Sequence, residues 1–360
     1  MADLVNDLAG RGHEVYLALR PKSPLIRELK KVVRENVTTI PLRNSLDAKS
    51  ARELSKLVRK HRIQIVHAHM ARDYPLAAYA VRQNKDARLI VTRHVLFRLS
   101  RLHRITLSGA SRIIAVSKAV ASQLRSDGVA APEKISVVLN GINTTGFEEA
   151  RPKFDRQQFL RSWNLPDNCL LVGTVGELTP LKGQAEFLQA AAQVLKQHPN
   201  AYFFVAGIDH SQGHRNRTAL EHLIEELNLT ERVRLVGWLE NLAQLYCALD
   251  VFVSASHTES FGLAIAEAMA SGAATVATET EGAREIIQPG ETGLLVPVRD
   301  VDKLSEAVLE LLDNKDRRIL LGGAAQRSVV TQFSVERMID ETEEIYRAEI
   351  EKIDANVTND

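Results

Sequence analysis

The sequence contains little cysteine, few aromatic residues and no long apolar run. Among 360 residues there are two cysteines, Cys169 and Cys247, and aromatic residues make up 5%. Two thiols form at most one disulfide, and their apolar neighbours favour buried free thiols. No stretch approaches the roughly 20 consecutive apolar residues of a membrane-spanning helix, and the first residues lack the apolar core of a secretory signal. We therefore expect a cytoplasmic location.

The charges are distributed unevenly, although the net charge is only +1. Residues 1–147 contain 26 Lys and Arg against 11 Asp and Glu, whereas the remaining residues contain 20 against 34. This asymmetry indicates that the first half faces something anionic, such as a membrane surface, a phosphorylated substrate or nucleic acid. Because no recognisable nucleic-acid motif is present, we expect no nucleic-acid partner.

The length and the apolar pattern predict an α/β fold of two doubly wound, Rossmann-like domains. Short apolar runs alternate with amphipathic helical stretches in both halves, which is typical of parallel sheets. Ligands of such folds bind at the carboxyl ends of the strands, and we expect them in a cleft between the two domains. The expected strands are residues 13–19, 63–68, 88–92, 112–116 and 134–139, then 170–175, 201–206, 233–236, 251–254, 274–277 and 293–296.

Changes in composition suggest the domain boundaries. We expect a basic first domain over residues 1–147, a linker over 148–167, a second domain over 168–330 and a C-terminal helix within 331–360. The chain opens in a helix that stops at Gly10 or Gly12 and leads straight to a strand at His13, whereas a doubly wound domain starts with a central strand. We therefore expect that the first domain lacks that strand. Either the gene product begins upstream of Met1, or the gap is filled in another way.

The segment from Glu259 to Gly272 carries the most informative chemistry. It follows the strand at 251–254 and predicts a helix from about Phe261 that ends at Gly272. The free amides at the start of such a helix suit a phosphate. Glu267 lies among small apolar residues, where a carboxylate is costly unless donors satisfy it. Glu259 and Glu267 would be about 12 Å apart on one helix, enough to meet the two ends of a nucleotide sugar. Alternatively, Glu259 complements the helix dipole and Glu267 is solvated.

This segment resembles the E-x7-E signature of glycosyltransferase family 4, whose members are retaining enzymes with the GT-B fold of two facing Rossmann-like domains. Other segments are similar to the family's motifs in the same order along nearly the whole chain. These are Gly12–Val15, Ile65–His69, Ile114–Ser117, Leu139–Ile142, Val172–Gly183, Val233–Gly237 and Glu281–Pro297. The resemblance also implies that the helix within 331–360 returns to the first domain.

The resemblance implies a role for several residues of the second domain. Glu267 would bind the ribose hydroxyls and Glu259 the hydroxyls of the donor sugar. Lys182 would hold the diphosphate, helped by Ser260 and by the amides of the residues that follow it, namely Phe261, Gly262 and Leu263. A fixed ammonium and oriented amides stabilise a leaving diphosphate without a metal, so we expect neither a metal nor a cofactor. For Lys182 taken alone, a solvated lysine in a turn is the ordinary alternative.

One residue departs from the family pattern. Five positions before Lys182, where the family usually has an arginine, this chain has Glu177. An acid beside a diphosphate is repulsive. Glu177 therefore points away, pairs with a cation, or indicates altered or weak activity.

Three histidines of the first half lie at expected strand ends. His94 resembles the family histidine that reaches the donor sugar near the reacting carbon, although a lone histidine after a strand is often structural. His67 and His69 are two residues apart, and without a third ligand they do not indicate a metal site. The acidic pair Asp300 and Asp302 precedes a helix and indicates an N-cap rather than a metal motif.

Basic and apolar residues alternate after His94. Arg98, Arg101 and Arg104 are spaced by three, as are Leu96, Leu99 and Leu102, which on a helix gives adjacent basic and apolar stripes. Such stripes are typical of an ordinary packed helix, or of a surface for an anionic acceptor or phospholipid head groups.

Together these features predict a metal-independent retaining glycosyltransferase. It would move a sugar from a nucleoside diphosphate donor to a hydroxyl of a lipid-linked or anionic glycan of the cell envelope, with possible peripheral contact to an anionic membrane at its inner face. Two alternatives stay open. One is a GT-B enzyme with another reaction, such as an epimerase or a phosphorylase, and the other is a non-catalytic relative that binds a nucleotide or a glycan.

Overall fold

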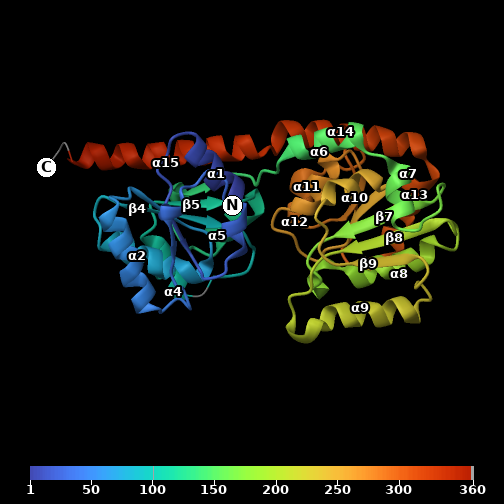
Figure 1. The fold of residues 1–360 in the computed structure, drawn as a ribbon, viewed down its shortest axis with the longest axis horizontal. Coiled ribbons are helices and arrows are strands. Elements are labelled where there is room, and N and C mark those ends of the chain that lie inside the picture. Colours follow the sequence, from blue (N-terminus) through green and yellow to red (C-terminus); the bar gives the residue numbers. More distant parts are fainter. Residues whose placement is uncertain (100, 358–360) are drawn as a thin grey trace. The chain divides into compact units, whose positions relative to one another are not determined.

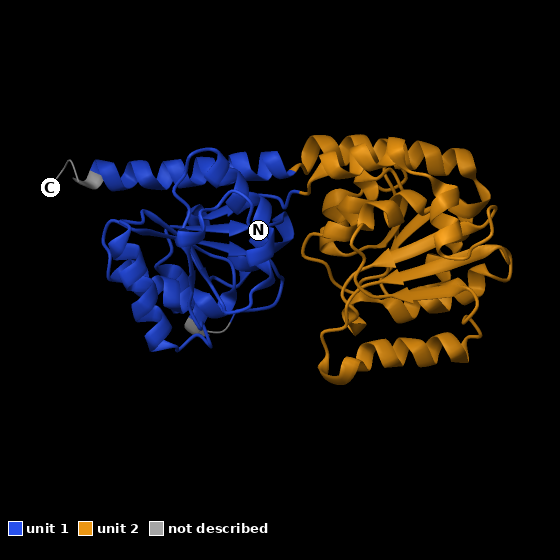
Figure 2. Cartoon of the chain, viewed as in Figure 1, with its two compact units in different colours: residues 1–141, 335–360 blue, residues 142–334 orange. Residues whose placement is uncertain are grey.

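The chain forms two compact units. The computed structural model describes residues 1–99 and 101–357, apart from the side chains of residues 101, 102, 356 and 357. Unit 1 comprises Met1–Gly141 and the segment from Val335 onward, and unit 2 comprises Ile142–Ser334 (Figure 2). Within the described residues, no helix is both long and apolar enough to cross a membrane.

Unit 1 combines short parallel strands with helices (Figure 1). Its strands are β1 (Leu17–Leu19), β2 (Val37–Thr39), β3 (Ile65–Ala68), β4 (Arg88–Arg93), β5 (Arg112–Ala115) and β6 (Ile135–Val137). Its helices are α1 (Ala2–Gly10), α2 (Ala48–Lys60), α3 (Tyr74–Arg82), α4 (Arg101–Ser108), α5 (Lys118–Ser126) and α15 (Val335–Val357). Side-chain caps start two of them, because Asp47 accepts from the amide of Ser50 and Ser117 from that of Val120.

The described strands of unit 1 form two separate parallel sheets. β1 pairs with β2, while the second sheet has the order β3-β4-β5-β6. No described strand joins the two sheets, which agrees with the expectation that this unit lacks a central strand. The sequence did not predict β2, because three residues are too few to show a period. Because β1 shares no hydrogen-bond ladder with the second sheet, apolar packing holds it against the rest of unit 1. Ala18 of β1 lies against buried Ile40, Leu42 and Leu76.

An ionic network fastens α15 to the rest of unit 1. Arg11 Nη1 lies 2.7 Å from Glu343 Oε2, and His13 Nε2 lies 3.0 Å from Glu343 Oε1. Further along the helix, Arg112 Nη2 lies 3.1 Å from Glu349 Oε1. Both glutamates are buried. Acidic residues of α15 therefore neutralise part of the positive charge of residues 1–147. Only the basic side chains that are not paired with α15 are available to an anionic partner.

The Glu343 contacts predict an acid-sensitive attachment of α15. Hydrogen bonds from His13, Arg11 and Arg347 lower the pKa of Glu343 to about 2. A lowered pKa means that the carboxylate stabilises the fold above about pH 4.3, and that this stabilisation disappears as the pH falls toward 2. We expect Glu343→Gln to lower the free energy of unfolding at pH 7 by about 1–2 kcal/mol, and to flatten its decline between pH 4.5 and 2.

Urea unfolding followed by circular dichroism at several pH values measures this effect. Glu344→Gln is the matched control, because Glu344 is the neighbouring residue of α15 and is exposed. Equal pH dependence in the Glu343→Gln variant and the wild type would contradict the role given to Glu343.

Unit 2 is a six-stranded parallel sheet covered by helices on both faces (Figure 1). The order is β12-β11-β10-β7-β8-β9. The strands are β7 (Leu170–Val175), β8 (Ala201–Ala206), β9 (Val233–Val236), β10 (Val251–Ser254), β11 (Ala274–Thr278) and β12 (Leu294–Val296). The helices are α6 (Thr144–Lys153), α7 (Arg156–Ser162), α8 (Gln184–Val194), α9 (Arg215–Glu226), α10 (Leu242–Ala248), α11 (Leu263–Ala270), α12 (Glu281–Ile286), α13 (Val301–Asp313) and α14 (Lys315–Gln332). β7 to β10 have the bounds that the sequence predicted.

Residues 148–167, which we expected to be a linker, are largely helical. Most of them lie in α6 and α7, and both helices belong to unit 2. Arg156 Nη2 lies 2.6 Å from Asp250 Oδ2, and Leu160 is fully buried. The segment lacks a clear apolar period because polar side chains such as Arg156 make its packing contacts, so composition alone suggested a linker.

Two smaller expectations agree with the structure. Cys169 and Cys247 are free thiols, the first buried and the second half-buried. Asp300 caps α13, because its Oδ1 accepts a hydrogen bond from the amide of Lys303 at 2.9 Å.

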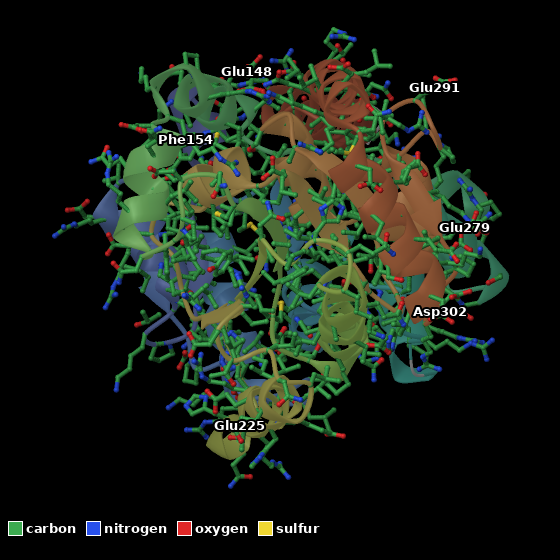
Figure 3. All side chains as sticks on the ribbon, turned by 90° about the vertical axis from the view of Figure 1, so that its right-hand side faces the viewer. Glu148, Phe154, Glu225, Glu279, Glu291 and Asp302 are labelled. Atoms are coloured by element: carbon green, nitrogen blue, oxygen red, sulfur yellow. The ribbon has the colours of Figure 1, made fainter. Side chains whose placement is uncertain are left out.

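The acidic side chains of unit 2 are spread over its surface. Those labelled in Figure 3 come from different segments, are exposed and do not form one cluster: Glu148, Glu225, Glu279, Glu291 and Asp302. The described residues hold no group of three or more His, Cys, Asp or Glu side chains that could bind a metal ion.

Candidate functional site

A short turn after β7 positions Lys182. The 3-10 helix Pro180–Lys182 follows the strand. Gly183, with φ +66°, is the N-cap residue directly before α8. The amide of His257 donates to the carbonyl of Leu181 at 2.8 Å, which joins this turn to the loop after β10. β7 and β10 are neighbours in the sheet, so that both loops lie at the carboxyl edge, where α/β folds bind ligands.

Gly183 is the tightest point of this arrangement. A Cβ there would lie 1.9 Å from the carbonyl oxygen of Ala255, and the positive φ already disfavours any other residue. We expect Gly183→Ala to lower the free energy of unfolding by about 2–3 kcal/mol, because strain and overpacking add.

Gly213→Ala provides the matched control for that substitution. Gly213 also lies in unit 2 and has φ +69°, but a Cβ there would meet nothing within 4 Å. Denaturant unfolding should show a cost of about 1 kcal/mol for the control. Equal costs for the two variants would show that the contact with Ala255 does not matter.

Lys182 and Glu259 form an ion pair. Lys182 Nζ lies 2.5 Å from Glu259 Oε1, which also accepts from Ser256 Oγ at 2.9 Å. The Glu259 side chain is 14% exposed and that of Lys182 is 33% exposed. The structure thus brings together two of the three residues that the sequence suggested for catalysis, with an ammonium partly accessible at the strand ends.

The helix that carries Glu267 begins later than predicted. α11 starts at Leu263, and Gly262 precedes it with φ +107°. The expected start at about Phe261 is therefore wrong. The 12 Å helical separation of Glu259 and Glu267 does not apply, because Glu259 lies in the loop. The physical reason is the positive φ of Gly262, which an α-helical residue does not adopt. Phe261 therefore stays outside the helix, where its buried ring packs edge-on against Phe333 at 5.6 Å.

This late start changes which groups face solvent at the beginning of α11. Leu263 is the first helical residue and is exposed, whereas Phe261 and Gly262 are buried and Ser260 is half-buried. The loop is also fixed from the side of α12, because the amide of Gly282 donates to the carbonyl of Glu259 at 3.0 Å. The first amides of α11 therefore belong to Leu263 and the residues after it.

A tyrosine that the sequence did not suggest satisfies Glu267. Tyr246, on α10, donates its hydroxyl to Glu267 Oε2 at 2.9 Å and is fully buried. Burial raises the pKa of Glu267 and also that of Tyr246. This hydrogen bond from the Tyr246 hydroxyl offsets part of the free-energy cost of burying the Glu267 carboxylate among apolar residues. No sequence motif indicates a role for Tyr246, because Tyr246 and Glu267 are 21 residues apart in the sequence and lie on different helices.

Glu177 does not compete for Lys182 in the described contacts. Its side chain is exposed, and its carbonyl oxygen accepts from Gln184 Nε2 at 2.9 Å. The ammonium of Lys182 contacts Glu259 instead. Of the three interpretations of Glu177, pairing with a cation is not observed among the described ion pairs.

In unit 1, the three histidines lie together at the ends of β3 and β4. His94 Nε2 is 3.2 Å from His69 Nδ1, while His67 contacts the Tyr346 hydroxyl and, at 2.7 Å, Thr92 Oγ1. Burial lowers the pKa of His67 to about 3. The contact between His94 and His69 was not expected. It favours neutral imidazoles, one donating to the other.

The three arginines after His94 do not share one helix. α4 begins at Arg101, and residues 94–99, which include Arg98, are not helical. The expected pair of stripes is therefore wrong for its first part. The exposed Arg98 lies 3.8 Å from Asp127 at the end of α5, and Arg104 is exposed on α4. The side chain of Arg101 lies outside the described residues.

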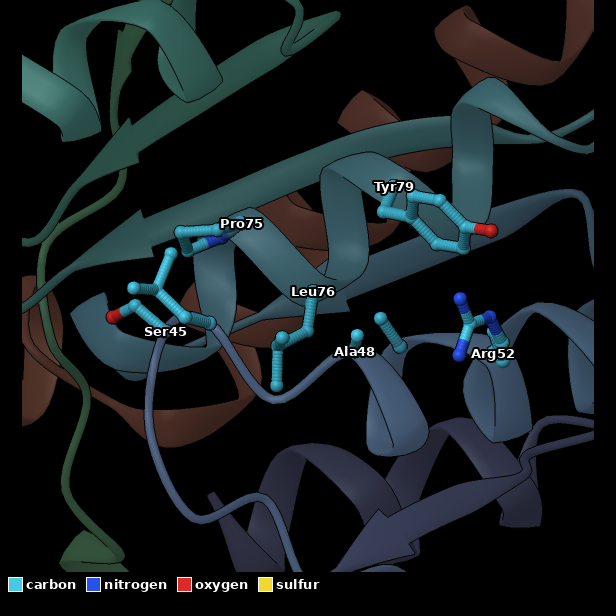
Figure 4. A pocket seen from close by; sticks show the side chains of 8 residues that line it. Ser45, Ala48, Arg52, Pro75, Leu76 and Tyr79 are labelled. Carbon is cyan, nitrogen blue, oxygen red and sulfur yellow. The ribbon is translucent and has the colours of Figure 1, made fainter.

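A shallow hollow of about 180 Å³ lies elsewhere in unit 1 (Figure 4). It is formed between the start of α2 and α3, and its lining is mainly apolar with Arg52 and Tyr79 at one side. None of the predicted site residues lines it.

Comparisons with known proteins agree with this geometry. The family of glycosyl transferases group 1 matches residues 155–327, and Glycosyltransferase Family 4 matches residues 1–145. An N-acetyl-alpha-D-glucosaminyl L-malate synthase of Bacillus anthracis is 26% identical, over 96% of this chain and 91% of the relative. A UDP-Gal:alpha-D-GlcNAc-diphosphoundecaprenol alpha-1,3-galactosyltransferase of Escherichia coli is 25% identical, over 92% of this chain and 88% of the relative.

A solved structure shows the same fold over almost the whole chain. The crystal structure of HepE from Anabaena in complex with UDP and glucose matches with a TM-score of 0.82 and 21% identity, and the match covers 96% of this chain and 94% of HepE. With two parallel-sheet units, each matched by its own family description, the chain belongs to glycosyltransferase family 4 and has the GT-B fold.

Proposed function

We propose that this glycosyltransferase moves a hexose from a nucleoside diphosphate sugar to an acceptor hydroxyl, with retention of the anomeric configuration. The observation that carries the proposal is the pairing of Lys182 with Glu259 at the carboxyl ends of β7 and β10, beside the start of α11. An ammonium and free helix amides suit a diphosphate, and a carboxylate held next to them suits sugar hydroxyls.

Each site residue then has a distinct task. Lys182 and the first amides of α11 bind the diphosphate, Glu259 accepts hydrogen bonds from the donor sugar, and Glu267 accepts them from the ribose. In the reaction the acceptor oxygen bonds to the anomeric carbon as the bond to the diphosphate oxygen breaks. The acceptor proton passes to that leaving oxygen. The negative charge that develops on the diphosphate is stabilised by Lys182, so this step requires no nucleophile from the protein.

For the other predicted site residues the support differs. The resemblance alone supports a contact of His94 with the donor sugar. Ser260, Phe261 and Gly262 lie in the loop directly before α11, and the resemblance alone supports their contact with the diphosphate.

For the acceptor we propose a lipid-linked or anionic glycan. The name of the Escherichia coli relative includes a UDP-sugar donor and a diphosphoundecaprenol acceptor. In unit 1, Arg98 and Arg104 are exposed near Phe97 and Ile105, which are 64% and 72% exposed. Exposed cations beside exposed apolar side chains favour contact with an anionic membrane surface.

A donor panel tests the proposed function. The protein is screened by thermal shift against UDP-, GDP- and ADP-sugars, and a stabilising donor is then incubated with lipid-linked and anionic acceptors. We expect donor-dependent product with retained configuration by NMR, unchanged after treatment with EDTA. An epimer formed from the donor alone would support the epimerase alternative. Tight donor binding without turnover on any acceptor would support the non-catalytic alternative.

A further inference from the structure

We propose that Trp238 is the stacking surface for the nucleobase of the donor, which makes it a determinant of nucleotide binding. The inference rests on the proposed function and adds a residue to it. Trp238 lies two residues beyond the end of β9 and is 72% exposed. An indole ring left in water forgoes a large gain from burial, and Trp238 lies at the carboxyl edge of the sheet, where α/β folds bind ligands.

Glycines at three neighbouring strand ends connect Trp238 to Lys182. β7, β8 and β9 lie side by side in the sheet, and each is followed directly by a glycine: Gly176, Gly207 and Gly237. This arrangement leaves a strip without side chains along the carboxyl edge. Strand ends without a Cβ allow a ligand to approach the backbone closely.

The contacts along this strip are short at each step. A Cβ at Gly176 would lie 3.6 Å from Lys182 Cδ, and a Cβ at Gly207 would lie 1.8 Å from the carbonyl oxygen of Gly176. The amide of Gly207 in turn donates to the carbonyl of Val236 at the end of β9. A Cβ at Gly237 would meet nothing within 4 Å. The strip thus starts beside the alkyl chain of Lys182 and ends, open, beside Trp238.

The connection that carries Trp238 also leads to the proposed ribose site. After Trp238 the chain enters α10 at Leu242, and Tyr246 on this helix donates to Glu267. A nucleoside diphosphate has three recognisable parts, and this edge offers one group for each. Lys182 suits the diphosphate, Glu267 suits the ribose hydroxyls, and an exposed indole suits a base because every base has a π-face.

The second tryptophan differs in its surroundings. Trp163 is half-buried and packs against Phe204 at a centroid distance of 5.2 Å. Among the described ring contacts Trp238 has none. Since the chain contains only two tryptophans, a Trp163→Phe variant leaves Trp238 as the sole indole fluorophore.

Fluorescence titration of the Trp163→Phe variant tests the contact directly. We expect UDP, GDP or ADP to quench the emission of Trp238, whereas pyrophosphate and ribose 5-phosphate should not, because they lack a base. Quenching by pyrophosphate equal to that by a nucleotide would contradict stacking.

Affinity measurements on the full chain complete the test. By calorimetry, Trp238→Ala should bind the preferred nucleoside diphosphate about tenfold more weakly than the wild type, and Trp238→Phe within about threefold, because a smaller aromatic face remains. Pyrophosphate affinity should not change in either variant. Unchanged nucleotide affinity in Trp238→Ala would overturn the role of Trp238 and leave the proposed function intact. If none of the three nucleotides binds the wild type, the proposed function and this inference both fail.

Discussion

Lys182→Ala is expected to lower kcat/KM for sugar transfer by about 10²–10³-fold. Removing one preorganised charge or donor from a leaving group costs this much in other enzymes. The structure adds a second reason, because Glu259 would lose its cation and retain Ser256 as a donor. A half-buried carboxylate without its partner repels a diphosphate. Initial rates over a range of donor concentrations separate the loss in kcat from the change in KM.

Two further variants make the Lys182 result specific. Lys182→Arg keeps a positive charge and should recover part of the rate, although its planar group fits the Glu259 contact differently. Lys196→Ala removes an exposed lysine that follows α8 in the same unit, and it should behave as the wild type. Wild-type kinetics in Lys182→Ala would remove the main support for the proposed diphosphate site.

Glu267→Gln is expected to weaken nucleoside diphosphate binding by about 10–50-fold. The carboxylate accepts a hydrogen bond from Tyr246 and has remaining lone pairs for ribose hydroxyls. The amide loses the charge-assisted part of these bonds, which corresponds to about 1.5–2.5 kcal/mol. The corresponding dideoxy nucleotide lacks the ribose hydroxyls, so that its affinity should be nearly equal in the variant and the wild type. Calorimetry with both ligands measures the difference.

The pH dependence gives an independent check on Glu267. Because burial raises the pKa of this carboxyl, nucleotide affinity of the wild type should fall on acidification at a higher pH than an ordinary glutamate would cause. Glu267→Gln has no such titration, so its curve should be flatter. If the variant shows the same affinity and the same pH dependence as the wild type, the carboxylate does not contact the ligand.

The sequence predicted unit 2 better than unit 1, for a physical reason. β7, β8 and β10 are largely buried parallel strands that are rich in apolar residues, which gives a strong signal. In unit 1, β1 and β2 are three residues long and half-exposed, so that their burial is decided by contacts distant in sequence. The sequence did not predict α6 and α7 for a similar reason. Arg156 of α7 forms an ion pair with Asp250, but in the sequence it cannot be distinguished from a solvated arginine.

For the candidate site, the family resemblance suggested Lys182, Glu259 and Glu267, and their roles stay predictions. It did not indicate that α11 starts only at Leu263, after Gly262 with its positive φ. The hydroxyl of Tyr246 and the exposure of Trp238 depend on packing between segments, and no local pattern marks them.

The discontinuity of unit 1 has a consequence for biosynthesis. Its last helix, α15, is translated only after the whole of unit 2 has been translated. Until then Arg11, His13 and Arg112 have no access to Glu343 and Glu349. Nascent unit 1 therefore waits, with unneutralised cations, while unit 2 completes its sheet. Termination directly after residue 334 would yield a complete second unit attached to a first unit that lacks α15.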